Sequence, residues 1–143
     1  MQYIFDKPII ASTGTEKYSC TILWSNGEFI VDEPEKVGGT GKGPDPYTLI
    51  LSSLGACTLA TLRMYVDRKG WDVPVIGVSL NMYHEVRDGK NVNVIDRSLN
   101  FISPLTDEQR ERLIQIARLC PISKLLEAGV QINTFAGAKN DIT

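Results

Sequence analysis

The sequence predicts an α+β fold, in which helices pack against a mostly antiparallel sheet. Strand-like alternation occurs before residue 31 and again between residues 73 and 102. A long apolar helical stretch separates these two regions, and an amphipathic helical pattern follows residue 106. Strands and helices that come in separate runs are typical of this class. The 143 residues contain no repeat or linker, so we expect a single domain over 1–143.

The N-terminal region is predicted to form strands. Apolar residues of one parity alternate with others over 17–24, and a second short apolar run covers 28–31. Asn26 and Gly27 lie between the two runs, and this dipeptide is a strong signal for a tight hairpin. We therefore expect a hairpin here, preceded by a strand or strands over residues 2–13.

Residues 32–45 form a polar, glycine-rich segment with the sequence DEPEKVGGTGKGPD. A phosphate-binding loop would need Gly five positions before its Gly-Lys pair and Ser or Thr after the lysine. Lys36 and Gly43 occupy those two positions. We interpret the segment as a surface loop that leads into the long helix, and not as a phosphate site.

The long helix is predicted over residues 43–71. Asp45 and Pro46 suit its first turn, and Gly70 suits its C-terminal cap. No charged residue occurs over 49–62, and a helix that is apolar on every side is typical of a domain interior. The uncharged run is shorter than the roughly 20 residues that a membrane span needs.

Two further strands are predicted over 73–86 and 91–102, with Asp88-Gly89 as the turn between them. A second helix is expected to begin at Thr106, whose spacing to Gln109 is that of a capping box. One face of that helix is expected to be buried, and its residues are Leu113, Ile116, Ala117 and Cys120.

The C-terminal region is predicted to hold a short helix and a last strand. Pro121 interrupts the second helix, and a short helix is expected over 122–127, stopped by Ala128-Gly129. Residues 131–135 are predicted to form a final strand.

The composition and charge of the chain bear on the partners and the location that we expect for it. A net charge of −2 gives no reason to expect a nucleic acid or a membrane surface as partner. The N-terminus lacks a basic stretch followed by an apolar core, so we expect a cytoplasmic protein. Zinc usually takes about four ligands, whereas the only histidine is His84 and no Cys-x-x-Cys pair occurs. No metal site is therefore predicted, and nothing in its spacing pairs His84 with a cysteine nucleophile.

Two of the three cysteines are candidates for the chemistry of this chain. Cys57 lies mid-helix among small residues, and Cys120 directly precedes Pro121 at a helix start, where the positive end of the helix dipole favours a thiolate. Inert burial is the alternative for each, and Cys20 is interpreted as packed. Together Cys57 and Cys120 suggest a dithiol in which one thiolate attacks an oxidant and the other closes a disulfide.

Two segments of the chain read GPDPYTLILSSLGACTLATLRMYVDRKGW and LTDEQRERLIQIARLCPISKLLEAGVQINT. These segments resemble the OsmC/Ohr superfamily of osmotically inducible and organic hydroperoxide resistance proteins, in particular its OsmC-like branch. The resemblance implies an intertwined homodimer with sheets wrapped on long central helices. It also implies a thiol-dependent peroxidase for organic hydroperoxides, with Cys57 peroxidatic and Cys120 resolving. Electrons would come from a dithiol reductant, such as a lipoylated protein, with no cofactor.

The family's activating Glu and Arg are not evident. Tyr47 and Thr48 occupy the segment where the family places its Glu, and no Arg precedes Arg63. Thr48 and Ser53 are candidate hydrogen-bonding residues for the site, and Lys42 is a candidate cation. Two alternatives remain open: a non-catalytic redox sensor or small-ligand-binding protein, and a thiol-transfer enzyme that acts on disulfides.

Overall fold

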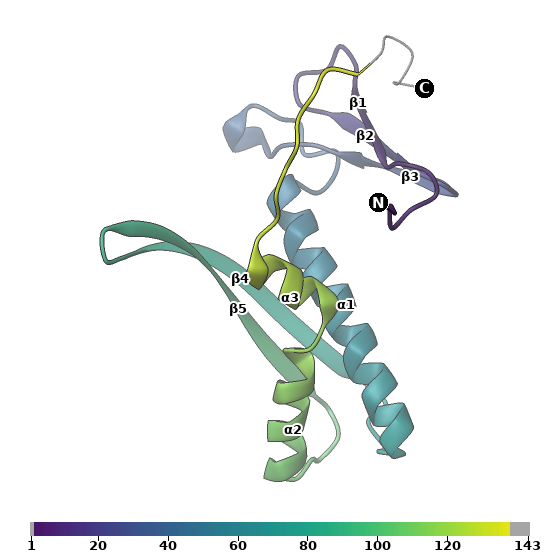
Figure 1. The fold of residues 1–143 in the computed structure, drawn as a ribbon, viewed down its shortest axis with the longest axis vertical. Helices are drawn as coiled ribbons and strands as arrows, with labels where there is room; N and C mark the ends of the chain where they lie inside the picture. The colour runs from purple at the N-terminus through teal and green to yellow at the C-terminus, as the bar shows by residue number, and fades with distance from the viewer. Residues whose placement is uncertain (1, 138–143) are drawn as a thin grey trace. The chain divides into compact units, whose positions relative to one another are not determined.

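A computed structural model describes residues 2–137, which form two compact units (Figure 1). Among the described residues, the first contains 2–49 and 132–137, and the second contains Ile50–Gln131. A single domain over 1–143 stays a prediction. The elements follow the order strands, long helix, strands, helices, and every strand pairing is antiparallel. The predicted α+β class is confirmed.

The first unit holds a three-stranded antiparallel sheet with the order β1-β2-β3. Its strands are β1 (Ile10–Thr13), β2 (Cys20–Trp24) and β3 (Gly27–Val31). The predicted hairpin is confirmed, because β2 pairs with β3. The turn residues are Ser25 and Asn26, and Gly27 belongs to β3, where it pairs with Trp24.

The prediction of a strand or strands over residues 2–13 is wrong for residues 2–9, which lie outside the sheet. Tyr3 and Ile4 are 84% and 90% exposed, so neither face of this segment is buried. Pro8 also lacks the N–H that a sheet ladder requires. The sheet therefore begins only at Ile10.

The loop after β3 is organised by the buried carboxylate of Asp32, and its only regular element is the 3-10 turn η1 (Glu35–Val37). Asp32 accepts hydrogen bonds from the backbone N–H of Glu33 at 2.8 Å and from those of Thr40 and Lys42 at 3.2 Å. The Thr40 hydroxyl donates a fourth at 2.7 Å. These donors are occupied by a carboxylate of the chain itself, which agrees with the loop not being a phosphate site.

The long helix α1 (Pro46–Lys69) lies within the predicted range 43–71, and the residues at its two ends are the predicted ones. Asp45 Oδ1 accepts the backbone N–H of Thr48 at 2.6 Å, so the aspartate caps the first turn. The Thr48 hydroxyl and this N–H together hold the pKa of Asp45 below its ordinary value. Gly70, at φ +67°, ends the helix in the left-handed conformation.

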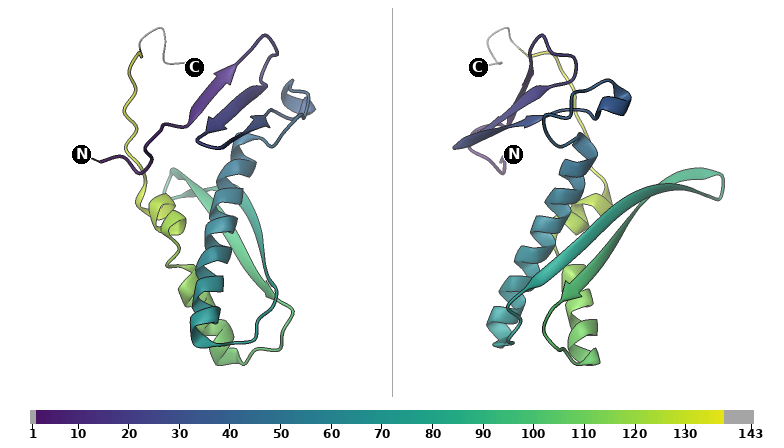
Figure 2. Two further views of the ribbon diagram at one scale, coloured as in Figure 1. Left: turned by 90° about the vertical axis from the view of Figure 1, so that its right-hand side faces the viewer. Right: turned by 180° about the vertical axis from the view of Figure 1, so that it is seen from behind.

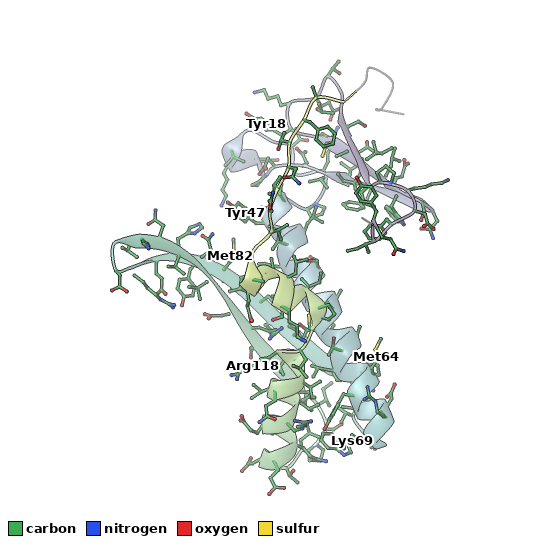
Figure 3. All side chains as sticks on the ribbon, viewed as in Figure 1. Tyr18, Tyr47, Met64, Lys69, Met82 and Arg118 are labelled. Carbon is green, nitrogen blue, oxygen red and sulfur yellow. The ribbon has the colours of Figure 1, made fainter. Side chains whose placement is uncertain are left out.

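Only one face of α1 is buried, so the expectation of a helix surrounded by its own domain is wrong for the single chain. Met64 is 65% exposed and projects from the helix (Figure 3). The helix contains a window of mean hydropathy 1.5 and is long enough to cross a membrane, a test that a soluble core helix also passes. The absence of a membrane stays a prediction. The buried residues are Leu54, Gly55, Thr58, Leu62, Tyr65 and Val66.

The second unit contains one long antiparallel hairpin, β4 (Ile76–Arg87) and β5 (Lys90–Phe101). Asp88 and Gly89 have φ values of +50° and +74°, as the predicted tight turn requires. Pro74 has no N–H to donate, and β4 starts two residues after it. Figure 2 shows the turn end of the hairpin extending beyond the helices of the same unit.

The predicted C-terminal helices are α2 (Asp107–Ala117) and α3 (Pro121–Ala128). The capping box at Thr106 is confirmed: its hydroxyl accepts the Gln109 N–H at 3.1 Å, and the Gln109 side chain accepts the Thr106 N–H at 3.0 Å. The core of this unit joins α1 and α2, and its buried members are Leu62, Tyr65, Val66, Val73, Leu113, Ile116 and Ala117.

A final strand over 131–135 is wrong, because the structure assigns no strand to these residues. Ile132 and Phe135 are 83% and 85% exposed, so the apolar alternation buries neither face. Alternation predicts a strand only where the segment also finds a sheet edge to join.

Candidate functional site

Cys57 and Cys120 lie in the same compact unit, and their side chains interact. Cys57 is half-buried in the middle of α1, whereas Cys120 is fully buried at the start of α3. Both thiols are free. The sequence predicted a dithiol without fixing its geometry, and the structure brings the two residues together.

Cys120 is the N-cap of α3. Its sulfur accepts the backbone N–H of Ser123 at 3.4 Å, and Pro121 occupies the first helical position. A helix start supplies free N–H groups and the positive end of the helix dipole, and both favour a negative charge on the capping atom. The Cys-Pro step therefore places a thiol where a thiolate is stabilised.

The pKa of the Cys120 thiol lies below its ordinary value. Burial acts in the opposite direction, but the hydrogen-bonding contributions outweigh it. The largest comes from the Cys57 thiol, and the backbone N–H groups of Ser123 and Ile122 and the Thr58 hydroxyl follow. Donors aimed at a sulfur favour its charged form.

The pKa of the Cys57 thiol is raised instead. Burial is the largest cause, and Cys120 adds to it both as a hydrogen-bond partner and as a nearby negative charge. The Ile122 N–H and the Thr61 hydroxyl lower it only in part. Cys120 is therefore the thiol of the pair that ionises more readily, because its pKa is lowered while that of Cys57 is raised.

Thr58 connects this pair to an arginine that the sequence analysis missed. The fully buried Thr58 hydroxyl donates to the Leu54 carbonyl at 2.7 Å and accepts from Arg97 Nη1 at 3.0 Å. Arg97 lies on β5 opposite Leu80. Arg97 follows the cysteine helix in the sequence, and its position inside a strand-like segment is the signal that could have indicated it.

A cavity of about 370 Å³ opens between β5 and α2 beside Arg97. It combines three cationic side chains with an apolar wall. One of them, Arg118, lies just after the end of α2 (Figure 3). Its lining residues are Arg97, Ser98, Leu99, Phe101, Arg110, Ile114, Ala117 and Arg118.

The small residues before Cys57 serve close packing. A Cβ at Gly55 would lie 3.0 Å from Leu80 Cδ1, so the glycine admits a β4 side chain against α1. The hydroxyl of Ser53 donates to the Ile50 carbonyl at 2.8 Å and is thus bound to its own helix. The role of Ser53 beside Cys57 stays a prediction.

Two other predicted supporting residues belong to the first unit. Lys42 Nζ forms an ion pair with the Glu16 carboxylate at 2.6 Å, and Thr48 interacts with Asp45. Their proposed roles at the dithiol therefore stay predictions. Cys20, on β2, is half-buried.

His84 lies on the exposed part of β4, where its Nδ1 is 2.6 Å from Asn93 Oδ1. Within residues 2–137, no cluster of three or more His, Cys, Asp or Glu side chains could hold a metal ion. The chemistry-bearing groups of the second unit are therefore the two thiols and the hydrogen-bond donors around them.

Comparisons with known proteins identify the family and the fold of the chain. The family model of the OsmC-like proteins matches residues 39–135, which include both cysteines. No curated protein matches.

Similar solved structures include an OsmC-like protein from Mycoplasma pneumoniae, with a TM-score of 0.70 and 22% identity over 86% of this chain and 89% of that one. An organic hydroperoxide resistance protein from Elizabethkingia anophelis has a TM-score of 0.63 and 22% identity over 87% of this chain and 89% of that one. The organic hydroperoxide resistance protein OhrB of Bacillus subtilis has a TM-score of 0.59 and 21% identity over 85% of this chain and 90% of that one. The likeness extends over most of each chain, and the chain belongs to the OsmC-like protein family.

Proposed function

We propose that this protein is a thiol-dependent peroxidase that reduces organic hydroperoxides through a Cys57/Cys120 dithiol–disulfide cycle. The observation that carries the proposal is the interaction of two free thiols, one of them a helix N-cap with a lowered pKa. Membership of the OsmC-like family supports a redox role, and two structural neighbours are named as organic hydroperoxide resistance proteins.

The cycle balances in three steps. The Cys57 sulfur attacks the terminal peroxide oxygen, the O–O bond breaks, and the alcohol leaves after taking a proton. Cys57 is then a sulfenic acid, and the Cys120 thiolate attacks its sulfur to form a disulfide and release hydroxide. An external dithiol reduces the disulfide by thiol exchange.

The exposed apolar face of α1 supports a homodimer, in which a second copy would cover that face. We place the protein in the cytoplasm, where a reducing environment keeps its three cysteines as thiols between turnovers. The reductant is a dithiol, such as a lipoylated protein. The cycle needs no metal or cofactor, and we propose neither nucleic acid nor membrane as a partner.

The test is stopped-flow consumption of cumene hydroperoxide by the reduced protein with a dithiol reductant. Wild-type protein and the Cys20→Ser control are expected to turn over at the same rate, because the proposed cycle uses only the thiols of Cys57 and Cys120. Cys57→Ser is expected to consume no more hydroperoxide than buffer with reductant. Consumption of hydroperoxide by Cys57→Ser at the wild-type rate would refute the proposed role of Cys57 as the nucleophile.

A non-catalytic redox sensor or small-ligand-binding protein is the second candidate. The raised pKa of Cys57 favours it, because a protonated thiol reacts slowly with peroxides. The two candidates differ in turnover. A sensor would form the disulfide once and would not consume hydroperoxide continuously when a dithiol is supplied.

A further inference from the structure

The cavity between β5 and α2 has no role in the proposed cycle, and its lining combines positive charge with apolar surface. Its volume of about 370 Å³ lies within the range of small-molecule sites. Three of the described residues that line it are arginines, and none is acidic. The whole chain has a net charge of −2, so this concentration of positive charge is a local feature of the cavity.

Two of the arginines come from one face of α2. Arg110 and Arg118 are eight residues apart, which corresponds to about 12 Å along a helix axis, and Ile114 lies midway between them on the same face. The acidic residues of α2 all line a different groove. The positive charge of the cavity face is therefore not compensated by the helix that carries it.

The protein does not pair these two arginines with a carboxylate. Within residues 2–137, the guanidinium groups of Arg110 and Arg118 form no ion pair and no side-chain hydrogen bond. The helix dipole favours a cation at a C-terminus, which explains the position of Arg118 at the end of α2. It does not explain Arg110, which lies nearer the positive end of the helix.

The third arginine is held in place. Arg97 Nη1 donates to the hydroxyl of Thr58 at 3.0 Å, and Thr58 is a fully buried residue of α1. Among the described residues, the Arg97 side chain makes no other hydrogen bond, although a guanidinium has five N–H groups. Arg97 thus presents oriented donors at the cavity, and a guanidinium can bind a carboxylate through two parallel hydrogen bonds.

The rest of the lining is mainly apolar and is supported by the core. Leu99 and Phe101 share the face of β5 that carries Arg97, because alternate residues of a strand point the same way. Both pack against the hydrophobic core of the second unit, and Ile114 and Ala117 add apolar surface from α2. An inorganic anion would gain nothing from this wall, whereas an organic anion could use both parts of the lining.

We propose that this cavity binds a small organic carboxylate. Arg97 supplies oriented donors to the carboxylate group, and the two arginines of α2 add positive charge. The apolar body of the ligand lies against Leu99, Phe101 and Ile114. The inference goes beyond the proposed peroxidase function, because neither thiol takes part in binding.

The two parts of the lining predict two properties of the ligand. Each CH₂ group that is buried on the apolar wall should strengthen binding by about fourfold, so affinity should increase with chain length. Binding should also weaken as salt is added, because two of the three arginines are exposed to solvent.

The test is a titration of the full-length, ¹⁵N-labelled protein with sodium hexanoate, followed by the backbone amide chemical shifts in NMR spectra. We expect saturable shifts at lining residues such as Ser98 and Ile114. Three matched probes separate charge from apolar surface: hexylamine has the opposite charge, 1-hexanol has none, and inorganic phosphate has no apolar body. Hexanoate is expected to bind at least about fivefold more tightly than each of them.

Substitutions of the arginines test their roles. Arg97→Gln is expected to weaken hexanoate binding by about tenfold, because it removes a charged hydrogen-bond donor. Arg110→Gln and Arg118→Gln are expected to weaken it by about threefold each, since their charges are exposed. Arg112→Gln is the matched control, because it removes the same charge from the same helix but lines the other groove.

Thermal unfolding shows whether each variant is folded. The substitutions at Arg110 and Arg118 change exposed side chains and keep the test decisive if Arg97→Gln does not fold.

Each alternative occupant has its own result. Phosphate that binds as tightly as hexanoate would overturn the organic ligand and leave a general anion site. Equal binding of hexylamine would overturn the role of the arginines. A glutamate-rich peptide that displaces hexanoate and binds more tightly would assign the surface to an acidic protein instead. Hexanoate that causes no shifts in the cavity would also overturn the proposal, and none of these results depends on reaction with a hydroperoxide.

Discussion

Asp32 and Cys120 are each surrounded by a similar set of hydrogen-bond donors that favours a negative charge, and we call each set a cradle. In the first unit, the Asp32 carboxylate accepts three backbone N–H groups and the hydroxyl of Thr40. In the second unit, the Cys120 sulfur interacts with backbone N–H groups of α3 and with the hydroxyl of Thr58. Each cradle combines main-chain donors with one threonine, and each lowers the pKa of the group it holds.

The difference lies in the group itself. An aspartate has an ordinary pKa of 3.8, and the donors around Asp32 lower it further, so this carboxylate is charged at neutral pH and its cradle serves to fix the loop. A thiol has an ordinary pKa of 9.0, so donors that lower the pKa of Cys120 increase the fraction of this residue that is a thiolate at neutral pH. The comparison teaches that one arrangement of donors gives structure around Asp32 and reactivity around Cys120.

Replacing Cys120 should have the largest effect. Both Cys120→Ser and Cys120→Ala are expected to abolish continuous hydroperoxide consumption, because neither can close the disulfide. Their stabilities should differ: serine is a good N-cap, whereas alanine is expected to cost between about 0.5 and 1 kcal/mol. Steady-state turnover and thermal unfolding check the two effects. Equal stability of the two variants would show that the cap contributes little.

Removing Asp32 should break the other cradle without affecting the chemistry of the thiols. Asp32→Ala leaves the N–H groups of Thr40 and Lys42 without their acceptor, so their hydrogen exchange should accelerate by roughly tenfold or more.

The cradle of Asp32 also has a pH signature. Because its folded pKa lies below 3.8, its stabilising contribution is complete above that value and is lost as pH falls through the folded value. Asp32→Asn should lack this acid-dependent part. Exchange rates at Thr40 that do not change in Asp32→Ala would contradict the structural role.

The pH dependence of the first turnover should separate the two cysteines. In wild-type protein the rate of sulfenic acid formation should continue to rise above pH 9.0, because Cys57 is the attacking thiol and its burial together with Cys120 raises its pKa. In Cys120→Ser the contributions of the Cys120 thiol to that raised pKa are lost, so the midpoint of the rate profile should move to lower pH. Trapping the sulfenic acid over a pH series measures this. Identical profiles would show that Cys120 does not influence the ionisation of Cys57.

Much of the fold could be predicted from sequence, because strong local signals coincide with the elements. The capping box at Thr106, the turn at Asp88-Gly89 and the cap at Asp45 each have a mechanism within a few residues of the chain. The N-cap position of Cys120 could be predicted from the Cys-Pro step for the same reason. The prediction of a strand over residues 131–135 was wrong because a strand needs a neighbouring sheet edge, which no local pattern reveals.

The partners in the site could not be predicted, because they come from distant elements. Arg97 is 39 residues from the Thr58 hydroxyl to which it donates. Its reach depends on the register of β5 against β4, where it pairs with Leu80. Composition and spacing identified both thiols, but not the charge beside them.

One glycine near each cradle, Gly43 and Gly55, allows the packing of the two regions to be compared by substitution, and Gly55→Ala has the smallest expected effect. A Cβ at Gly43 would overlap the backbone carbonyl oxygen of Ile30, so Gly43→Ala must displace main chain next to the Asp32 loop. A Cβ at Gly55 would meet only the movable end of Leu80 at 3.0 Å.

In Gly55→Ala the gain in helix propensity, about 1 kcal/mol, offsets the small shift of Leu80. We expect its stability to stay within about 1 kcal/mol of wild type and its sulfenic acid rate to stay within about twofold. Chemical denaturation and single-turnover kinetics, with Gly43→Ala as the disruptive comparison, test this. A large loss of rate in a stable Gly55→Ala protein would mean that the small residues before Cys57 admit the substrate as well as Leu80.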